Sequence, residues 1–105
     1  MNSFDDWEPR IERLRRLSGE MLEQAQSGEW DALIEREQER RALLEELFQR
    51  EPPAELAPQL DETIRAVLAS DVRVQELARG ERNRLGDALK AFNQGRRALS
   101  AYQDA

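Results

Sequence analysis

The stretch "SGEWDALIEREQERRALLEELF", residues 27–48, decides the fold of this chain. A glycine stands two positions before Trp30, and leucines set among dense charges follow. Gly28 occupies the place of a helix C-terminal glycine, because glycine adopts the left-handed conformation at little cost. Glu29 and Asp31 favour the positive end of the dipole of a second helix that begins at once. A connection this short predicts two antiparallel helices that form a hairpin.

The helices of this hairpin are bounded by recognisable signals. Before Gly28, apolar residues recur at steps of three and four and predict a helix over about 6–27. After it, a second helix over about 29–50 ends before Pro52-Pro53. Trp30 would lie at the tip of the hairpin, where we expect its ring to cover the end of the apolar seam.

A long apolar pattern follows the prolines. It predicts one helix over about 58–93, with a bend near Gly80 as the alternative, and nothing else breaks the pattern before Gly95. A short helical segment over about 96–103 would end the chain. The positions of the long stripe are Leu60, Ile64, Val67, Val74, Ala78, Leu85, Leu89 and Phe92. The fold class is therefore an all-α antiparallel bundle of three main helices, in a single domain spanning 1–105.

Two surpluses of apolar residues appear on the long helix. At ~1.5 Å per residue it would reach ~54 Å, against ~33 Å for the hairpin helices, so its last third would overhang. The terminal segment, a second copy or a client protein would have to cover this overhang. Earlier, Ile64, Leu68 and Val72 form a ridge at steps of four. This ridge either packs on the hairpin in a three-helix core or forms one wall of a groove for a partner's amphipathic helix.

The charged residues favour solvated helix faces over a site of chemistry. Glu37 and Arg41 form a pair at the favoured spacing of four, and Asp71 has a similar position beside the apolar stripe. We expect Glu37, Arg41 and Asp71 to form a partly buried layer that sets the register of the helices. The remaining acidic runs follow from a composition of 22 Asp and Glu in 105 residues.

The composition also excludes or disfavours several classes of function. The chain has no Cys and no His, which removes thiolate nucleophiles, disulfides and the usual zinc sites. A net charge of −6 disfavours a nucleic-acid surface, and no apolar run is long enough to cross a membrane. There is no glycine-rich phosphate loop and no secretory signal at the N-terminus. We expect no enzyme activity, no cofactor and no metal.

Several stretches together resemble one known family. They are "LEQAQSGEWDAL" at 22–33, "EREQERRALLEELF" at 35–48 and the terminal "GRRALSAY" at 95–102, combined with a proline-bearing loop and a long third helix. This combination resembles the flagellar export chaperone FliT family over nearly the whole chain. The Gly-Glu-Trp-Asp turn is the most specific part of the resemblance.

The resemblance implies a function and a set of partners. Members of this family bind the C-terminal helical segment of the filament-cap protein in the cytoplasm, keep it unassembled and deliver it to the export ATPase complex. Some also bind and restrain the flagellar master transcription regulator. A C-terminal helix can lie over the client site and regulate access. Here that regulatory segment would fall within 94–105, with Leu99 and Tyr102 as its apolar contacts. The client-binding candidates are Ile64, Leu68, Val72, Leu85 and Leu89.

Two other classes of function stay open. One is a coiled-coil adaptor unrelated to flagella, whose overhanging third helix dimerises. The other is a small regulator of transcription or secretion, for which client binding is secondary. The sequence leaves the choice between a monomer and a homodimer open, because the same apolar overhang is compatible with both.

Overall fold

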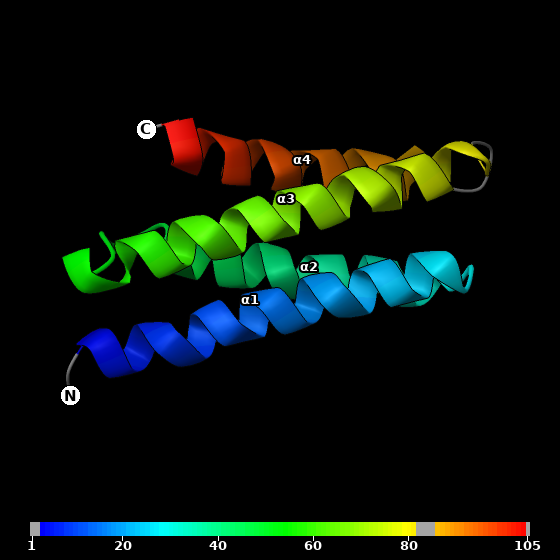
Figure 1. The fold of residues 1–105 in the computed structure, drawn as a ribbon. Helices are drawn as coiled ribbons and strands as arrows, with labels where there is room; N and C mark the ends of the chain where they lie inside the picture. Colours follow the sequence, from blue (N-terminus) through cyan, green and yellow to red (C-terminus); the bar gives the residue numbers. More distant parts are fainter. Residues whose placement is uncertain (1–2, 82–85, 105) are drawn as a thin grey trace.

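The computed structural model describes residues 3–81 and 86–104, and every element in these ranges is helical. The elements are α1 (Ser3–Gln26), α2 (Trp30–Leu47), the short 3-10 turn η1 (Ala54–Leu56), α3 (Ala57–Arg79) and α4 (Gly86–Asp104). They form an elongated bundle of 45 × 24 × 19 Å (Figure 1). The all-α bundle predicted from the sequence is confirmed; in the described ranges, α3 and α4 stand in place of the predicted long third helix and short terminal segment.

The four helices form two hairpins, α1 with α2 and α3 with α4 (Figure 1). Helix α1 packs against α2 and α3, and α4 packs against the same two helices. Within the described ranges the backbones of α1 and α4 do not approach each other, nor do those of α2 and α3. These two pairs therefore occupy the diagonals of the bundle. The proline-bearing connection before α3 runs across one diagonal, which explains why it is longer than the turn before α2.

The turn between α1 and α2 has the geometry expected from its glycine. Gly28 has a φ of 73°, in the left-handed region. Its N–H donates to the carbonyl of Ala25 over 3.2 Å, and the N–H of Glu29 donates to that of Gln24 over 2.8 Å. This pair of bonds is the Schellman arrangement, which satisfies the last carbonyls of a helix and reverses the chain.

The core consists of two clusters of buried apolar side chains. Trp30 belongs to the cluster near the turn of the first hairpin, where it packs with Met21, Ala25, Leu33, Val74, Ala78 and Phe92. The larger cluster occupies the other part of the bundle and contains Trp7, Ile11, Leu14, Leu17, Leu43, Leu44, Leu47, Leu56, Leu60, Ile64, Val67 and Leu99. Residues of α4 belong to both clusters, so α4 is an integral wall of the core.

The prediction of one continuous helix over 58–93 is wrong. Helix α3 ends at Arg79 with Gly80 as its C-cap, and α4 begins at Gly86 and runs back along the bundle. Glycine is a poor helix former, and reversing the chain here buries Phe92, which is 2% exposed. The overhang predicted for the end of the third helix therefore does not exist.

The break predicted at Gly95 is also wrong, because Gly95 lies inside α4. The segment expected over 96–103 is the second half of this longer helix. Among the apolar positions of the predicted overhang, Leu85 and the side chain of Leu89 lie outside the described residues.

Candidate functional site

The candidate site is the surface of α2 and α3 on which α4 lies. The apolar face of α4 provides Phe92 and Leu99, which are 2% and 0% exposed. Further along α4, the half-buried Tyr102 ring stacks on Phe48, the C-cap residue of α2, with ring centroids 4.8 Å apart. Leu99 and Tyr102, predicted as the apolar contacts of a covering segment, thus pack in or against the larger core cluster. An amphipathic helix already occupies this surface.

Polar side chains tie α4 to α3 along the same interface. The amide of Gln103 donates to the Asp61 carboxylate over 3.2 Å, and the guanidinium of Arg96 donates to the Gln75 carbonyl oxygen over 2.8 Å. The amide of Gln75 in turn donates to Asn93. These contacts lie at the partly exposed edge of the interface, where water competes for the same polar groups and reduces the net contribution of each hydrogen bond to stability.

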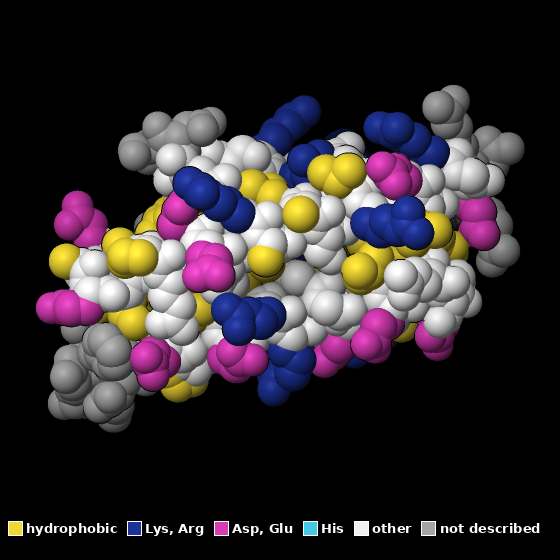
Figure 2. All heavy atoms as spheres, viewed as in Figure 1, with side chains coloured by type: hydrophobic (Ala, Val, Ile, Leu, Met, Phe, Trp, Pro, Cys, Tyr) yellow, Lys and Arg dark blue, Asp and Glu magenta, His cyan; other side chains and the backbone are white. Residues whose placement is uncertain are grey.

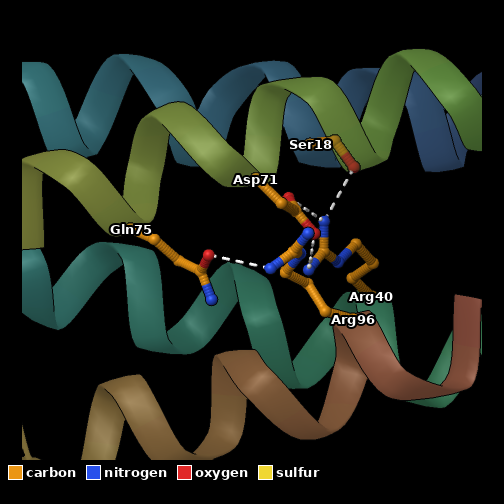
Figure 3. Close-up of polar contacts among 5 residues, drawn as sticks. All are labelled: Ser18, Arg40, Asp71, Gln75 and Arg96. Atoms are coloured by element: carbon orange, nitrogen blue, oxygen red, sulfur yellow. Dashed lines mark hydrogen bonds and ion pairs between the residues drawn. The ribbon is translucent and has the colours of Figure 1, made fainter. Parts of the chain in front are cut away.

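A layer of buried polar side chains crosses the middle of the bundle, and we call Ser18, Glu37, Arg40 and Asp71 the polar layer. Arg40 of α2 is 0% exposed and reaches Asp71 of α3 across the diagonal (Figure 3). Its two terminal nitrogens donate to the two carboxylate oxygens over 2.9 and 3.1 Å. One of them also donates to the Ser18 hydroxyl of α1 over 3.1 Å. The Arg40 guanidinium lies 5.5 Å from the centre of the Phe92 ring of α4.

Glu37 completes the polar layer on α2. It is 1% exposed, and both of its carboxylate oxygens accept hydrogen bonds from Arg41, over 3.2 and 3.1 Å. The sequence-based layer placed Arg41 beside Asp71, whereas the structure places Arg40 there. The missed signal was the spacing of the inner face of α2: its positions 33, 37, 40, 44 and 47 recur at alternating steps of four and three.

The environment of the polar layer changes the acidity of its carboxyl groups. Burial raises the pKa of Asp71, against the opposing influence of the Arg40 guanidinium. Burial likewise raises the pKa of Glu37, against the opposing influence of Arg41 and Arg40. Within residues 3–81 and 86–104, no group of acidic side chains is arranged to hold a metal ion. Buried pairs of this kind specify how helices pack more than they stabilise them.

The predicted client-binding ridge on α3 turns from the core to the surface. Ile64 is 0% exposed inside the larger cluster, Leu68 is half-buried against that cluster, and Val72 is 43% exposed. Four residues advance a helix by a little over one turn, so each step rotates the side chain by about 40°. In this arrangement Ile64 belongs to the core, and Leu68 and Val72 follow the edge of α3. Leu85 and the side chain of Leu89 are outside the described part of the chain.

The visible surface has no dominant chemical character. Among the described large apolar side chains, Val72 is the exposed one. Figure 2 shows small apolar patches between charges of both signs on one face of the molecule. None of the described helices has the length and apolarity that crossing a membrane requires. The interface between α4 and the pair α2 and α3 is therefore the most distinctive feature of the described structure.

Comparison with known proteins shows the family to which the chain belongs. A family model described as flagellar protein FliT matches residues 8–104, which is nearly the whole chain. No curated protein and no solved structure matches the chain. The match covers both hairpins and includes the helix seated on the candidate site. The chain therefore belongs to the FliT family of flagellar proteins.

Proposed function

We propose that this protein is a non-catalytic export chaperone of the flagellar system that acts in the cytoplasm. It would bind the C-terminal helical segment of the filament-cap protein, prevent its premature assembly and deliver it to the export ATPase complex. The observation that supports this proposal is the seating of α4, because a surface that accepts one amphipathic helix has the shape to accept another. Membership of the FliT family supports the flagellar setting.

The mechanism is an exchange of helices. The client helix would bury its apolar face against α2 and α3 in place of α4, which hides the surface through which the client self-associates. Phe48 and Leu68 would flank the bound helix, and Ile64 would lie beneath it in the core. Val72 is already exposed and would contact the client at the rim. Leu85 and Leu89 were predicted as client contacts on the third helix; Leu85 lies outside the described residues, and Leu89 belongs to α4, the helix that the client would replace.

In this mechanism α4 lowers the apparent affinity for the client. A binding site that is free in only a fraction of the molecules has its affinity reduced by that fraction. The flagellar master transcription regulator, which some family members bind, would be a second partner of the same surface. Because one helix at a time can occupy it, we expect the two partners to compete.

The experiment that tests this proposal fixes α4 in place. The chain has no cysteine, so Asp61→Cys and Gln103→Cys would introduce its only two thiols, at positions whose native side chains are 3.2 Å apart. A short cleavable bis-thiol reagent then links α4 to α3. Calorimetry with the C-terminal segment of the filament-cap protein should give micromolar binding before linking, no binding after it, and recovery after cleavage.

Two outcomes would contradict the proposal in different ways. Equal binding before and after linking would place the client away from the surface under α4. No binding to any form would remove the chaperone function and favour an adaptor or a regulator. The dimeric adaptor has lost its main support, because the overhanging third helix from which it was inferred is replaced by the α3–α4 hairpin.

A further inference from the structure

We infer that the surface under α4 selects helices that carry a small residue where they cross the polar layer, with an aromatic residue three positions before it and an aliphatic residue four positions after it. This inference rests on the proposed function, since it describes the client helix that would replace α4. It adds the chemistry by which the surface would recognise that helix. The evidence is the way in which α4 itself meets Glu37 and Arg40.

Gly95 is the residue of α4 that crosses the polar layer. It is buried, and a Cβ at this position would lie 3.2 Å from a carboxylate oxygen of Glu37 and 3.5 Å from a terminal nitrogen of Arg40. A contact of 3.2 Å is tighter than side chains usually make, so a larger residue requires Glu37 to move. Glycine also weakens a helix interior. Close approach to the polar layer explains why a glycine is found there.

The polar layer has little freedom to yield to a larger residue. Both carboxylate oxygens of Glu37 are held by Arg41, and this carboxylate is almost completely buried. Arg40 is held by Ser18 and by both oxygens of Asp71. Displacing either group would leave a buried charge without its hydrogen bonds, which is strongly unfavourable. The polar layer therefore disfavours a bound helix with a large residue at this position, both by steric clash and by the loss of buried hydrogen bonds.

The residues on either side of Gly95 define the rest of the pattern. Phe92, three positions earlier, presents its ring to the Arg40 guanidinium at 5.5 Å, a distance at which a cation and an aromatic face attract each other. Leu99, four positions later, is completely buried in the larger core cluster. These positions recur at helical spacing, so one face of a single helix satisfies all three requirements.

One part of the interface is left open by α4. A groove of about 320 Å³ lies between α2 and α4, and its walls are mostly apolar. Its lining comprises Arg41, Leu44, Glu45, Phe48, Gln94, Gly95 and Ala98. Ala98 offers this groove only a methyl group. A partner helix with leucine at the matching position would bury more apolar surface than α4 does, which would help it to displace a helix tethered to the same chain.

The test uses synthetic 86–104 peptides as probes of the surface. Four peptides are compared: the native sequence, and the same sequence with Gly95→Leu, Ala98→Leu or Ala101→Leu. Each is titrated into the full chain carrying Leu99→Asp, which disfavours seating of its own α4. If circular dichroism shows that this variant does not fold, the full chain with Tyr102→Ala is used, because Tyr102 is only half-buried.

The expected order of affinity follows from the geometry. Overpacking against fixed neighbours should weaken the Gly95→Leu peptide by roughly ten- to a hundredfold, although leucine is the better helix former. The Ala98→Leu peptide should bind several times more tightly than the native one. The Ala101→Leu peptide is the matched control, because Ala101 is exposed and does not line the groove. It should bind like the native peptide.

The inference is overturned if the Gly95→Leu peptide binds as tightly as the native peptide. It is also overturned if the native peptide binds neither the Leu99→Asp variant nor the Tyr102→Ala variant of the full chain. Its failure is distinguishable from that of the proposed function. If the four peptides bind in the expected order of affinity but the filament-cap segment does not bind, selection by the polar layer is supported and the chaperone function is contradicted. If the filament-cap segment binds but the four peptides bind with equal affinity, the chaperone function is supported and selection by the polar layer is contradicted.

Discussion

At the scale of single residues, Arg40 distinguishes this bundle from a purely apolar one. Its guanidinium is completely buried and bonds to Asp71 on the opposite diagonal helix and to Ser18 on a third. Removing two ions from water costs several kcal/mol for each, and only good geometry offsets this cost. The two parallel bonds between Arg40 and Asp71 supply that geometry. They also define one register of α2 against α3.

The first prediction concerns this pair. Arg40→Leu should lower the free energy of unfolding by about 3–5 kcal/mol, because it leaves the Asp71 carboxylate buried without its partner. Arg65→Leu is the control: it breaks a pair with Asp61 whose arginine is 74% exposed, and should cost less than about 1 kcal/mol. Urea denaturation followed by circular dichroism measures both. Equal losses of unfolding free energy in the two variants would show that the buried Arg40–Asp71 pair contributes no more to stability than the exposed Arg65–Asp61 pair.

The second prediction concerns the pH dependence of stability. Burial raises the pKa of Glu37 above its ordinary value of 4.5, so the folded chain binds this proton more tightly than the unfolded chain. The resulting stabilisation is fully present below pH 4.5 and is lost as the pH rises through the raised pKa. The stability of the native chain relative to Glu37→Gln should therefore increase on acidification from about pH 7.

Urea denaturation of the native chain and Glu37→Gln, side by side over a series of pH values, measures this difference. Glutamine keeps the size of the side chain and does not titrate, so other carboxyl groups contribute nearly equally to both proteins. A difference that shrinks on acidification would mean that Arg41 and Arg40 outweigh burial and lower the pKa of Glu37.

At the scale of elements, α4 combines strong and weak contacts along one helix. Phe92 and Leu99 are core residues, whereas the last turn of α4 relies on the stacked ring of Tyr102 and on one partly buried hydrogen bond from Gln103 to the Asp61 carboxylate. A single hydrogen bond at the partly exposed edge of an interface contributes little net stability, because water competes for both of its partners. We therefore expect the C-terminal end of α4 to separate from α2 before the remainder does.

The third prediction concerns the contribution of Tyr102 to holding α4 in place. Tyr102→Ala removes a stacked pair worth about 0.5–1.5 kcal/mol beyond its buried area and should raise the apparent affinity for the cap segment by up to about tenfold. Tyr102→Phe keeps the ring and should leave the affinity unchanged. Calorimetry with the cap segment gives both values. If Tyr102→Ala lowers stability and leaves the affinity unchanged, α4 does not control access to the client surface.

At the scale of the whole molecule, the bundle is two hairpins joined across a diagonal. The α3–α4 hairpin covers the apolar surface that the α1–α2 hairpin alone would leave in water. Because α4 contributes to both core clusters, moving it exposes part of the core. The same helix therefore contributes to stability and, in the proposed function, limits access of the client.

The class of fold and the first hairpin follow from the amino-acid sequence alone. Step sizes of three and four place Trp7, Ile11 and Leu14 on one face of α1, and Gly28 allows the reversal that follows. These features depend on local geometry, which a single chain segment contains. The sequence also predicts partial burial of Glu37 and Asp71, because both lie beside an apolar stripe, and in the structure both are almost completely buried.

The end of the third helix and the covering of α2 and α3 by α4 depend on tertiary packing. The apolar positions of α3 and α4 keep a helical spacing across the turn because both helices face the same core, so periodicity could not reveal the reversal after Arg79. The spacing of the inner face of α2 directs Arg40 inward, but packing made Asp71 its partner, and it also placed Ile64 inside and Val72 outside. Spacing along a chain specifies the direction of a side chain about its own helix. Which neighbour it meets depends on how the helices are arranged around it.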